Sequence, residues 1–194
     1  MTFGKMNHDL QHKGFNADRV MQFVSGGELW QGGYPPVDSG YLRREGFDVV
    51  VLAAEEFQPQ AARFGPGIAV IHAPNYDAPL ESGGDISRAV EASREVARAI
   101  RNGKKVLVTC AAGLNRSGLI TALSILRLTR LPGEKVIAAI RKARGPWAMS
   151  NEDFEKAVLE VARLRDANVV RASQEVANGR KANRRSRERS TEES

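Results

Sequence analysis

Cys110 is the single cysteine of this 194-residue chain, and an arginine stands six positions after it. The cysteine ends the apolar run KKVLVTC, and the small or turn-forming residues AAGLN separate it from Arg116 and Ser117. A second apolar segment, RSGLITALSIL, follows at once. A strand, a tight loop and a helix in this order would bring a thiol, a row of backbone N–H groups and a guanidinium to one place. Such a combination favours the binding and attack of an anion.

The chemistry that these groups can perform together is phosphoryl transfer. Inward-pointing amides and the positive end of a helix dipole favour the thiolate, which is the nucleophilic form of cysteine. The planar fork of Arg116 can hold two oxygens of a phosphate, and Ser117 can donate a hydrogen bond to the sulfur as it leaves. The thiolate would attack phosphorus, and water would then cleave the cysteinyl-phosphate. The predicted phosphate-binding residues are Ala111, Ala112, Gly113, Leu114, Asn115 and Arg116.

This chemistry calls for no metal, because the loop amides and the arginine stabilise the negative charge. The sequence also lacks a His, Cys and carboxylate cluster with metal-ligand spacing. We therefore expect neither a metal site nor a cofactor.

The elements that must position the loop follow from the hydrophobic pattern. The runs at 20–25, 29–33, 47–54, 68–74 and 104–110 read as strands, and the last three are apolar enough for burial on both faces. Helical periodicity starts after Asp85, at Arg116, after the turn LPG and near Ser150. Alternation of strands and helices predicts a single α/β domain with a central, mostly parallel sheet of about 4–5 strands flanked by helices.

At this point the sequence resembles the cysteine-dependent protein tyrosine phosphatase superfamily, in its dual-specificity phosphatase-like branch. The resemblance rests on the C-x5-R-S loop, and the segments GELWQGGYPP, FDVVVLAAEE, HAPNYDAP and MSNEDF are similar to family segments in the same order. The likeness covers about residues 20–165. It implies a phosphatase acting on phosphotyrosine, and on phosphoserine or phosphothreonine, of phosphorylated proteins.

The family also places an aspartate on a loop one helix and one strand before the cysteine. Asp77 matches it, 33 residues upstream of Cys110, and is predicted to protonate the leaving oxygen. Asn151 is similar to a family asparagine that braces the phosphate loop. One position departs from the pattern: Thr109 stands where the family usually has the histidine that helps to fix the loop and its thiolate.

Two alternative functions are also compatible with these residues. Asn115 in GLNRSG is similar to the corresponding loop of RNA 5′-triphosphatases in the same superfamily, and residues 180–194 hold six basic and three acidic residues that could contact RNA. A non-catalytic phosphate-binding module is the alternative of another class.

Composition and charge predict how the chain is divided. We expect a flexible lead-in at 1–17, the catalytic domain at 18–168 and a basic, disordered tail at 169–194, which has little to bury. The single cysteine excludes an internal disulfide and favours a reducing compartment, so we predict a cytoplasmic protein. No segment is apolar enough to span a membrane. The oligomeric state does not follow from the sequence.

Overall fold

A computed structural model describes residues 10–12, 14–79 and 83–192 of the chain. Over these residues the sheet has six strands in the order β1-β2-β3-β6-β4-β5. Strands β3, β6, β4 and β5 run parallel to one another, and β1 and β2 add an antiparallel edge. The mostly parallel α/β fold is confirmed, with the short β1 beyond the expected strands. The strands are β1 (Leu10–His12), β2 (Phe15–Gln22), β3 (Glu28–Gly32), β4 (Val49–Ala54), β5 (Ala69–Asn75) and β6 (Lys105–Thr109).

The start of the chain differs from the expected flexible lead-in at 1–17. Residues 10–12 and 15–17 pair with each other in an antiparallel hairpin, while residues 1–9 lie outside the described part. Phe15 and Ala17 are buried against the second face of the sheet. Burial of these two side chains gives the hairpin an apolar contact, which is the reason that this segment is ordered.

The two central strands are buried on both faces, because helices cover both. All six residues of β4 are buried. Val49 and Val51 face the larger hydrophobic cluster, and Val50 and Leu52 face the smaller one, as the two-residue period of a strand requires. β-Branched residues suit this environment, since their stiff side chains pack well on a pleated surface.

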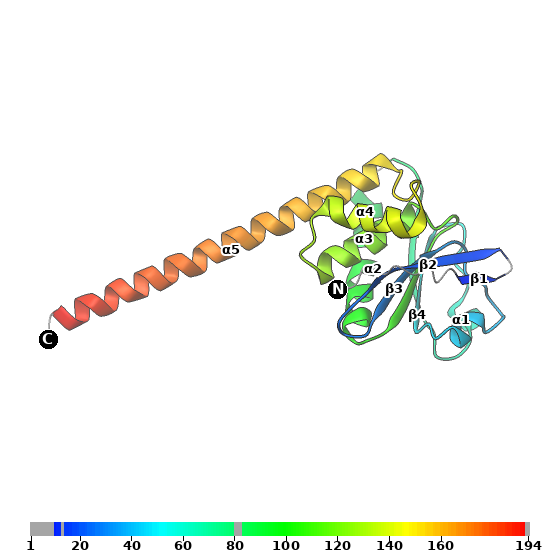
Figure 1. Ribbon diagram of the computed structural model, residues 1–194, viewed down its shortest axis with the longest axis horizontal. Coiled ribbons are helices and arrows are strands. Elements are labelled where there is room, and N and C mark those ends of the chain that lie inside the picture. The colour runs from blue at the N-terminus through cyan, green and yellow to red at the C-terminus, as the bar shows by residue number, and fades with distance from the viewer. Residues whose placement is uncertain (1–9, 13, 80–82, 193–194) are drawn as a thin grey trace.

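The helices divide unequally between the two faces. The long helices pack on the face of the larger cluster, and α1 and η1 cover the other (Figure 1). Helix α3, which follows the cysteine loop, is buried along eleven of its thirteen residues and lies centrally, as its apolar sequence predicts. The helices are α1 (Tyr41–Arg44), the 3₁₀ helix η1 (Ala61–Phe64), α2 (Gly83–Arg101), α3 (Arg116–Leu128), α4 (Gly133–Arg144) and α5 (Glu152–Glu192).

The C-terminal segment also differs from its expectation. Instead of a disordered tail at 169–194, helix α5 continues through Glu192 and extends away from the domain as a long rod (Figure 1). This part of the sequence is rich in Ala, Arg, Lys and Glu, which are good helix formers. An i,i+4 ion pair joins Arg171 to Glu175 at 3.1 Å. A helix satisfies its backbone hydrogen bonds within its own segment, and pairs of this kind add to its stability.

None of the helices in the described ranges combines the length and the hydropathy needed to cross a lipid bilayer.

Candidate active site

The carboxyl ends of three neighbouring parallel strands deliver the polar side chains of the site. Cys110 follows β6, Glu56 lies two residues beyond β4, and Asp77 lies two residues beyond β5. Since β5, β4 and β6 are adjacent and parallel, these three side chains emerge at one edge of the sheet. Ligands of open α/β folds bind at this edge.

The thiol of Cys110 lies at the base of the loop and is nearly inaccessible, with 2% of the residue exposed. It borders the larger hydrophobic cluster, but it has a polar neighbour on the loop side. The Oγ of Ser117 lies 3.3 Å from Sγ. The first turn of α3 therefore places a hydroxyl against the sulfur, as the sequence predicts.

The loop between Cys110 and Arg116 turns its carbonyl groups outward. The carbonyl of Ala111 accepts a hydrogen bond from the Tyr34 N–H at 3.3 Å, and that of Leu114 accepts one from the Met149 N–H at 3.4 Å. In a trans peptide unit the N–H points opposite to the carbonyl. The amides that follow these outward carbonyls therefore face the inside of the loop, where an anion would sit.

Two side chains brace the same loop from outside. The Nε2 of Gln31 donates to the carbonyls of Gly113 and Leu114 at 3.0 and 3.3 Å. The guanidinium of Arg144 donates to the carbonyls of Ala112 and Gly113, at 3.3 and 3.2 Å. Arg144 is in turn held by an ion pair with Asp18 of β2. Elements far apart in the sequence thus hold the loop in one shape.

Gly113 lies at the tightest point of this loop. Its φ of +72° is in the left-handed region, and a Cβ here would come within 2.4 Å of the Gly32 carbonyl carbon. Both conditions exclude a side chain, so the loop can pass this close to β3 only with glycine at this position.

Arg116 begins α3 and directs its guanidinium back across the loop. Its two terminal nitrogens hold the carboxylate of Glu56 at 2.5 and 2.9 Å, and one of them also donates to the Asn75 carbonyl at 3.3 Å. Only 6% of the arginine is exposed. Its remaining donor, Nε, is buried and has no partner among the described residues.

The electrostatics of this pair follow from its geometry. The hydrogen bonds from Arg116 lower the pKa of Glu56 from 4.5 to about 2. The same hydrogen bonds to Glu56 raise the pKa of Arg116. The Tyr34 hydroxyl also donates to Glu56 at 2.8 Å. Glu56 is therefore ionised at neutral pH. It occupies the edge of the guanidinium that could otherwise bind two phosphate oxygens.

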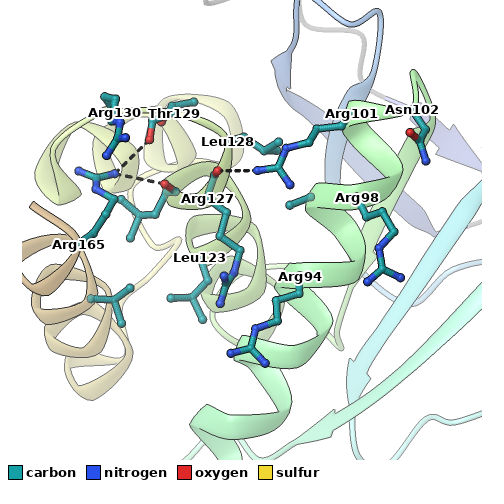
Figure 2. Close-up of a pocket in the computed structure, with 13 residues that line it drawn as sticks. Arg94, Arg98, Arg101, Asn102, Leu123, Arg127, Leu128, Thr129, Arg130 and Arg165 are labelled. Atoms are coloured by element: carbon teal, nitrogen blue, oxygen red, sulfur yellow. Dashed lines mark hydrogen bonds between the residues drawn. The ribbon is translucent and has the colours of Figure 1, made fainter. Parts of the chain in front are cut away.

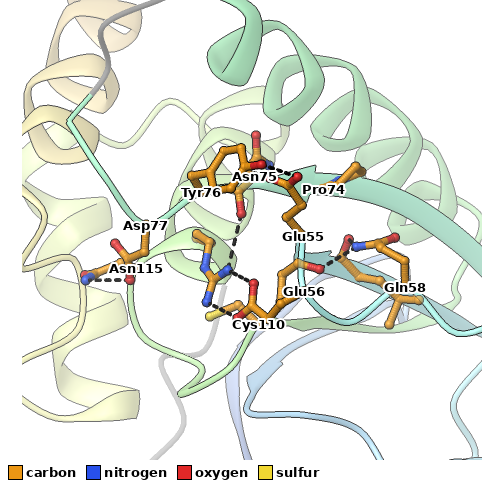
Figure 3. Close-up of polar contacts among 12 residues, drawn as sticks. Glu55, Glu56, Gln58, Pro74, Asn75, Tyr76, Asp77, Cys110 and Asn115 are labelled. Carbon is orange, nitrogen blue, oxygen red and sulfur yellow. Dashed lines mark hydrogen bonds and ion pairs between the residues drawn. The ribbon is translucent and has the colours of Figure 1, made fainter.

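Asp77 is exposed and is held by two asparagine amides. The Nδ2 of Asn115 donates to one carboxylate oxygen at 3.3 Å (Figure 3). The Nδ2 of Asn151 donates to the other at 3.2 Å. The Oδ1 of Asn151 accepts the N–H of Asp153 at 3.2 Å and so caps α5. The Oδ1 of Asn115 accepts the N–H groups of residues 150 and 151. This network ties the Asp77 loop to the cysteine loop and to the start of α5.

Thr109, at the position of the family histidine, points toward the neighbouring strand. Its hydroxyl is buried and donates to the Val51 carbonyl at 2.8 Å. It braces β6 against β4 and makes no contact with the loop that the structure records.

The structure thus brings Cys110, Ser117, Arg116 and Asp77 to one edge of the sheet. Sequence reasoning missed three residues that shape the site: Glu56, Gln31 and Arg144. Position alone could have indicated Glu56, because it follows directly on a buried parallel strand. Gln31 and Arg144 carry no such signal, since only the tertiary fold brings them near the loop.

Within the described chain, His, Cys, Asp and Glu side chains do not gather in groups of three or more that could hold a metal ion.

Comparisons with known proteins agree with this geometry. Residues 29–163 match the family described as "Dual specificity phosphatase, catalytic domain". A crystal structure of Tk-PTP in a mutant form is 25% identical, with a TM-score of 0.59 over 74% of this chain and 96% of that one. Human DUSP28 is 22% identical, with a TM-score of 0.59 over 76% and 95%. DUSP15 is 23% identical, with a TM-score of 0.62 over 80% and 94%. No curated protein matches the chain.

Proposed function

The chain belongs to the dual specificity phosphatase catalytic domain family and is a phosphatase of that type, and from this premise we propose that it hydrolyses phosphotyrosine, and phosphoserine or phosphothreonine, in proteins through a cysteinyl-phosphate on Cys110. The observation that carries this proposal is the loop itself. Its carbonyls point outward, its sulfur has a hydroxyl at 3.3 Å, and a buried guanidinium ends it.

Substrate binding begins with the phosphate dianion in the loop. The inward amides following residues 111–114 donate to its oxygens. Arg116 approaches the same oxygens with Nε, the buried donor that lacks a partner among the described residues. Glu56 keeps the terminal nitrogens in place meanwhile, so the arginine is already oriented when the phosphate arrives.

In the first chemical step the thiolate of Cys110 attacks phosphorus. A sulfur–phosphorus bond forms, the ester phosphorus–oxygen bond breaks, and its electron pair stays on the leaving oxygen. The protonated carboxyl of Asp77 transfers its proton to that oxygen, which is worth about 10²–10⁴-fold in rate for general acid catalysis. The two amides that hold Asp77 fix the carboxyl above the loop.

In the second step water attacks the phosphocysteine and the sulfur–phosphorus bond breaks. Asp77, now a carboxylate, accepts a proton from the attacking water. The sulfur leaves with the electron pair of the broken bond, and the Ser117 hydroxyl donates a hydrogen bond to the new thiolate across the observed 3.3 Å.

The test is to compare wild type with Cys110→Ser and Asp77→Asn on aryl phosphates of differing leaving-group basicity. We expect Cys110→Ser to lose turnover but still bind phosphate analogues, and Asp77→Asn to lose most rate on the poorest leaving groups. Acid-quenched mass spectrometry of wild type should find phosphate on the peptide that carries Cys110. Turnover by Cys110→Ser would refute the nucleophile, and equal losses across leaving groups would refute the acid.

Substrate preference is decided by a panel that sets phosphotyrosine and phosphoserine peptides against RNA with a 5′-triphosphate. We expect the phosphopeptides to be turned over faster. Faster release from the RNA would favour the 5′-triphosphatase alternative. The requirement for a reduced Cys110 is consistent with our prediction of a cytoplasmic protein.

A further inference from the structure

A cavity lined by arginines lies at the far end of α3 from the cysteine loop. Helix α3 has thirteen residues, so its two ends are about 20 Å apart. An open cavity of about 950 Å³ lies between the end of α3, the second half of α2 and α5 (Figure 2). No acidic residue lines it. Its lining includes six arginines, Arg94, Arg98, Arg101, Arg127, Arg130 and Arg165.

Two of these arginines donate to backbone carbonyls. Arg165 donates to the carbonyls of Leu126, Thr129 and Leu131 at 3.0–3.3 Å, and Arg101 donates to the carbonyl of Arg127 at 3.0 Å. These bonds satisfy carbonyl groups at the C-terminal end of α3, where the helix dipole also favours cations.

The charge of the other four is only partly balanced by described neighbours, through the attraction between Arg130 and the carboxylate of Asp166. Arg94, Arg98, Arg127 and Arg130 are all exposed, and none forms an ion pair with a described carboxylate. Partial burial of the guanidinium, with the charges of Arg94 and Arg101 nearby, lowers the pKa of Arg127, whose Nε also donates to the Ser93 Oγ at 2.8 Å. Like charges gathered in one hollow repel one another, so an anion bound here would relieve that repulsion.

The shape and the floor of the cavity narrow the class of ligand. Arg94, Arg98 and Arg101 follow one face of α2 over about 10 Å, which is the length of about three residues of extended chain. The floor is aliphatic, from Leu123, Leu126 and Val161. It has no aromatic residue on which a nucleic-acid base could stack.

We propose that this cavity is a docking site for an acidic peptide segment, which pairs its carboxylates with the arginines of α2 and α3 and places an aliphatic side chain on the floor. Charge complementarity selects the acidic residues, and the leucines and valine select the aliphatic one. That the segment belongs to the phosphoprotein substrate is the single point that rests on the proposed function. The site would then hold substrates by a contact remote from the phosphate.

The test is fluorescence anisotropy of the full chain with a labelled peptide of glutamates, aspartates and two leucines. The variant Arg94→Gln/Arg98→Gln should weaken binding about tenfold, because each lost charged contact is worth roughly a factor of ten or less when exposed. The matched control Arg43→Gln/Arg44→Gln removes two exposed arginines from α1, on the other face of the sheet. It should change binding less than about twofold. Arg130→Gln, on a different segment, serves as a second variant whose folding does not depend on α2.

The outcomes separate this proposal from the proposed function. Equal weakening by both double variants would overturn it, because long-range charge would then explain the binding. It would also be overturned by an absence of peptide binding, or by a short RNA or an anionic vesicle binding more tightly through the same arginines. Hydrolysis of a small aryl phosphate should be unchanged in every variant. If wild type fails to hydrolyse it, the proposed function fails, while the anisotropy still decides the docking site.

Discussion

The ion pair between Glu56 and Arg116 predicts a specific pH dependence of stability. Replacing Glu56 by glutamine removes the charge that faces the buried guanidinium and leaves the side chain nearly the same size. Because the folded-state pKa of Glu56 lies below its ordinary value, its stabilising contribution is complete above about pH 4.5. That contribution is lost as the pH falls toward about 2, and it is absent in Glu56→Gln at every pH.

The magnitude follows from the shift and from the exposure of the carboxylate. A lowering of the pKa from 4.5 to about 2 corresponds to an upper limit of about 3.4 kcal/mol. The Glu56 side chain is 49% exposed, so solvent screening reduces the expected value to about 1 kcal/mol. As the pH falls from neutral toward about 2, the free energy of unfolding of wild type should therefore decrease by about 1 kcal/mol more than that of Glu56→Gln.

Urea unfolding of both proteins at a series of pH values from 7 to 3 measures this difference. Comparing the two cancels the other carboxylates, which titrate alike in both. Glu91→Gln is the matched control, since Glu91 is an exposed residue of α2 and does not contribute to the pKa shift of Arg116. It should follow wild type at every pH. A gap between wild type and Glu56→Gln that does not change with pH would refute the reasoning, because the carboxylate would then gain nothing from Arg116.

Three further substitutions test how the loop and the acid are held. Gly113→Ala should lower the free energy of unfolding by about 3 kcal/mol or more, a drop of roughly 6–12 °C in the thermal midpoint, because it combines a left-handed φ with a backbone clash. The control Gly46→Ala has a φ of +79° but open space around it, so it should lower the free energy of unfolding by only about 1 kcal/mol. Equal losses in the two variants would refute the clash. Asn151→Ser keeps a helix-capping residue but loses the amide that holds Asp77. The free energy of unfolding should therefore change by less than about 1 kcal/mol, while turnover of substrates with poor leaving groups falls up to about tenfold. An unchanged dependence of the rate on the leaving group would contradict this role. Thr109→Val removes a buried hydroxyl bond and should cost about 1–2 kcal/mol of unfolding free energy with little change in turnover; a large loss of turnover at full stability would show that the hydroxyl acts on the loop.

Much of the candidate site could be predicted from the sequence because its parts are local. Seven consecutive residues carry the nucleophile, the loop and the arginine, and a strand before them and a helix after them are visible in the apolar pattern. Asp77 could also be predicted, because the family resemblance places an aspartate on the loop that follows the buried strand at 68–74. The N-terminal hairpin was not predicted, because its burial depends on packing against distant segments. The C-terminal helix was not predicted either, because a highly charged segment with little to bury is typical of disorder.

The chemistry of the site can be read from the residue types alone: one thiol, a loop of small residues that can turn its amides inward, and a guanidinium at the right spacing. The tertiary structure decided how those groups are held and what surrounds them. Gln31, Arg144 and Glu56 come from three separate elements, and only the parallel pairing and packing of those elements place them around the loop. The arginine-lined cavity likewise has no single segment of its own. Side chains far apart in the sequence act together only after burial of the core has fixed the positions of the elements that carry them.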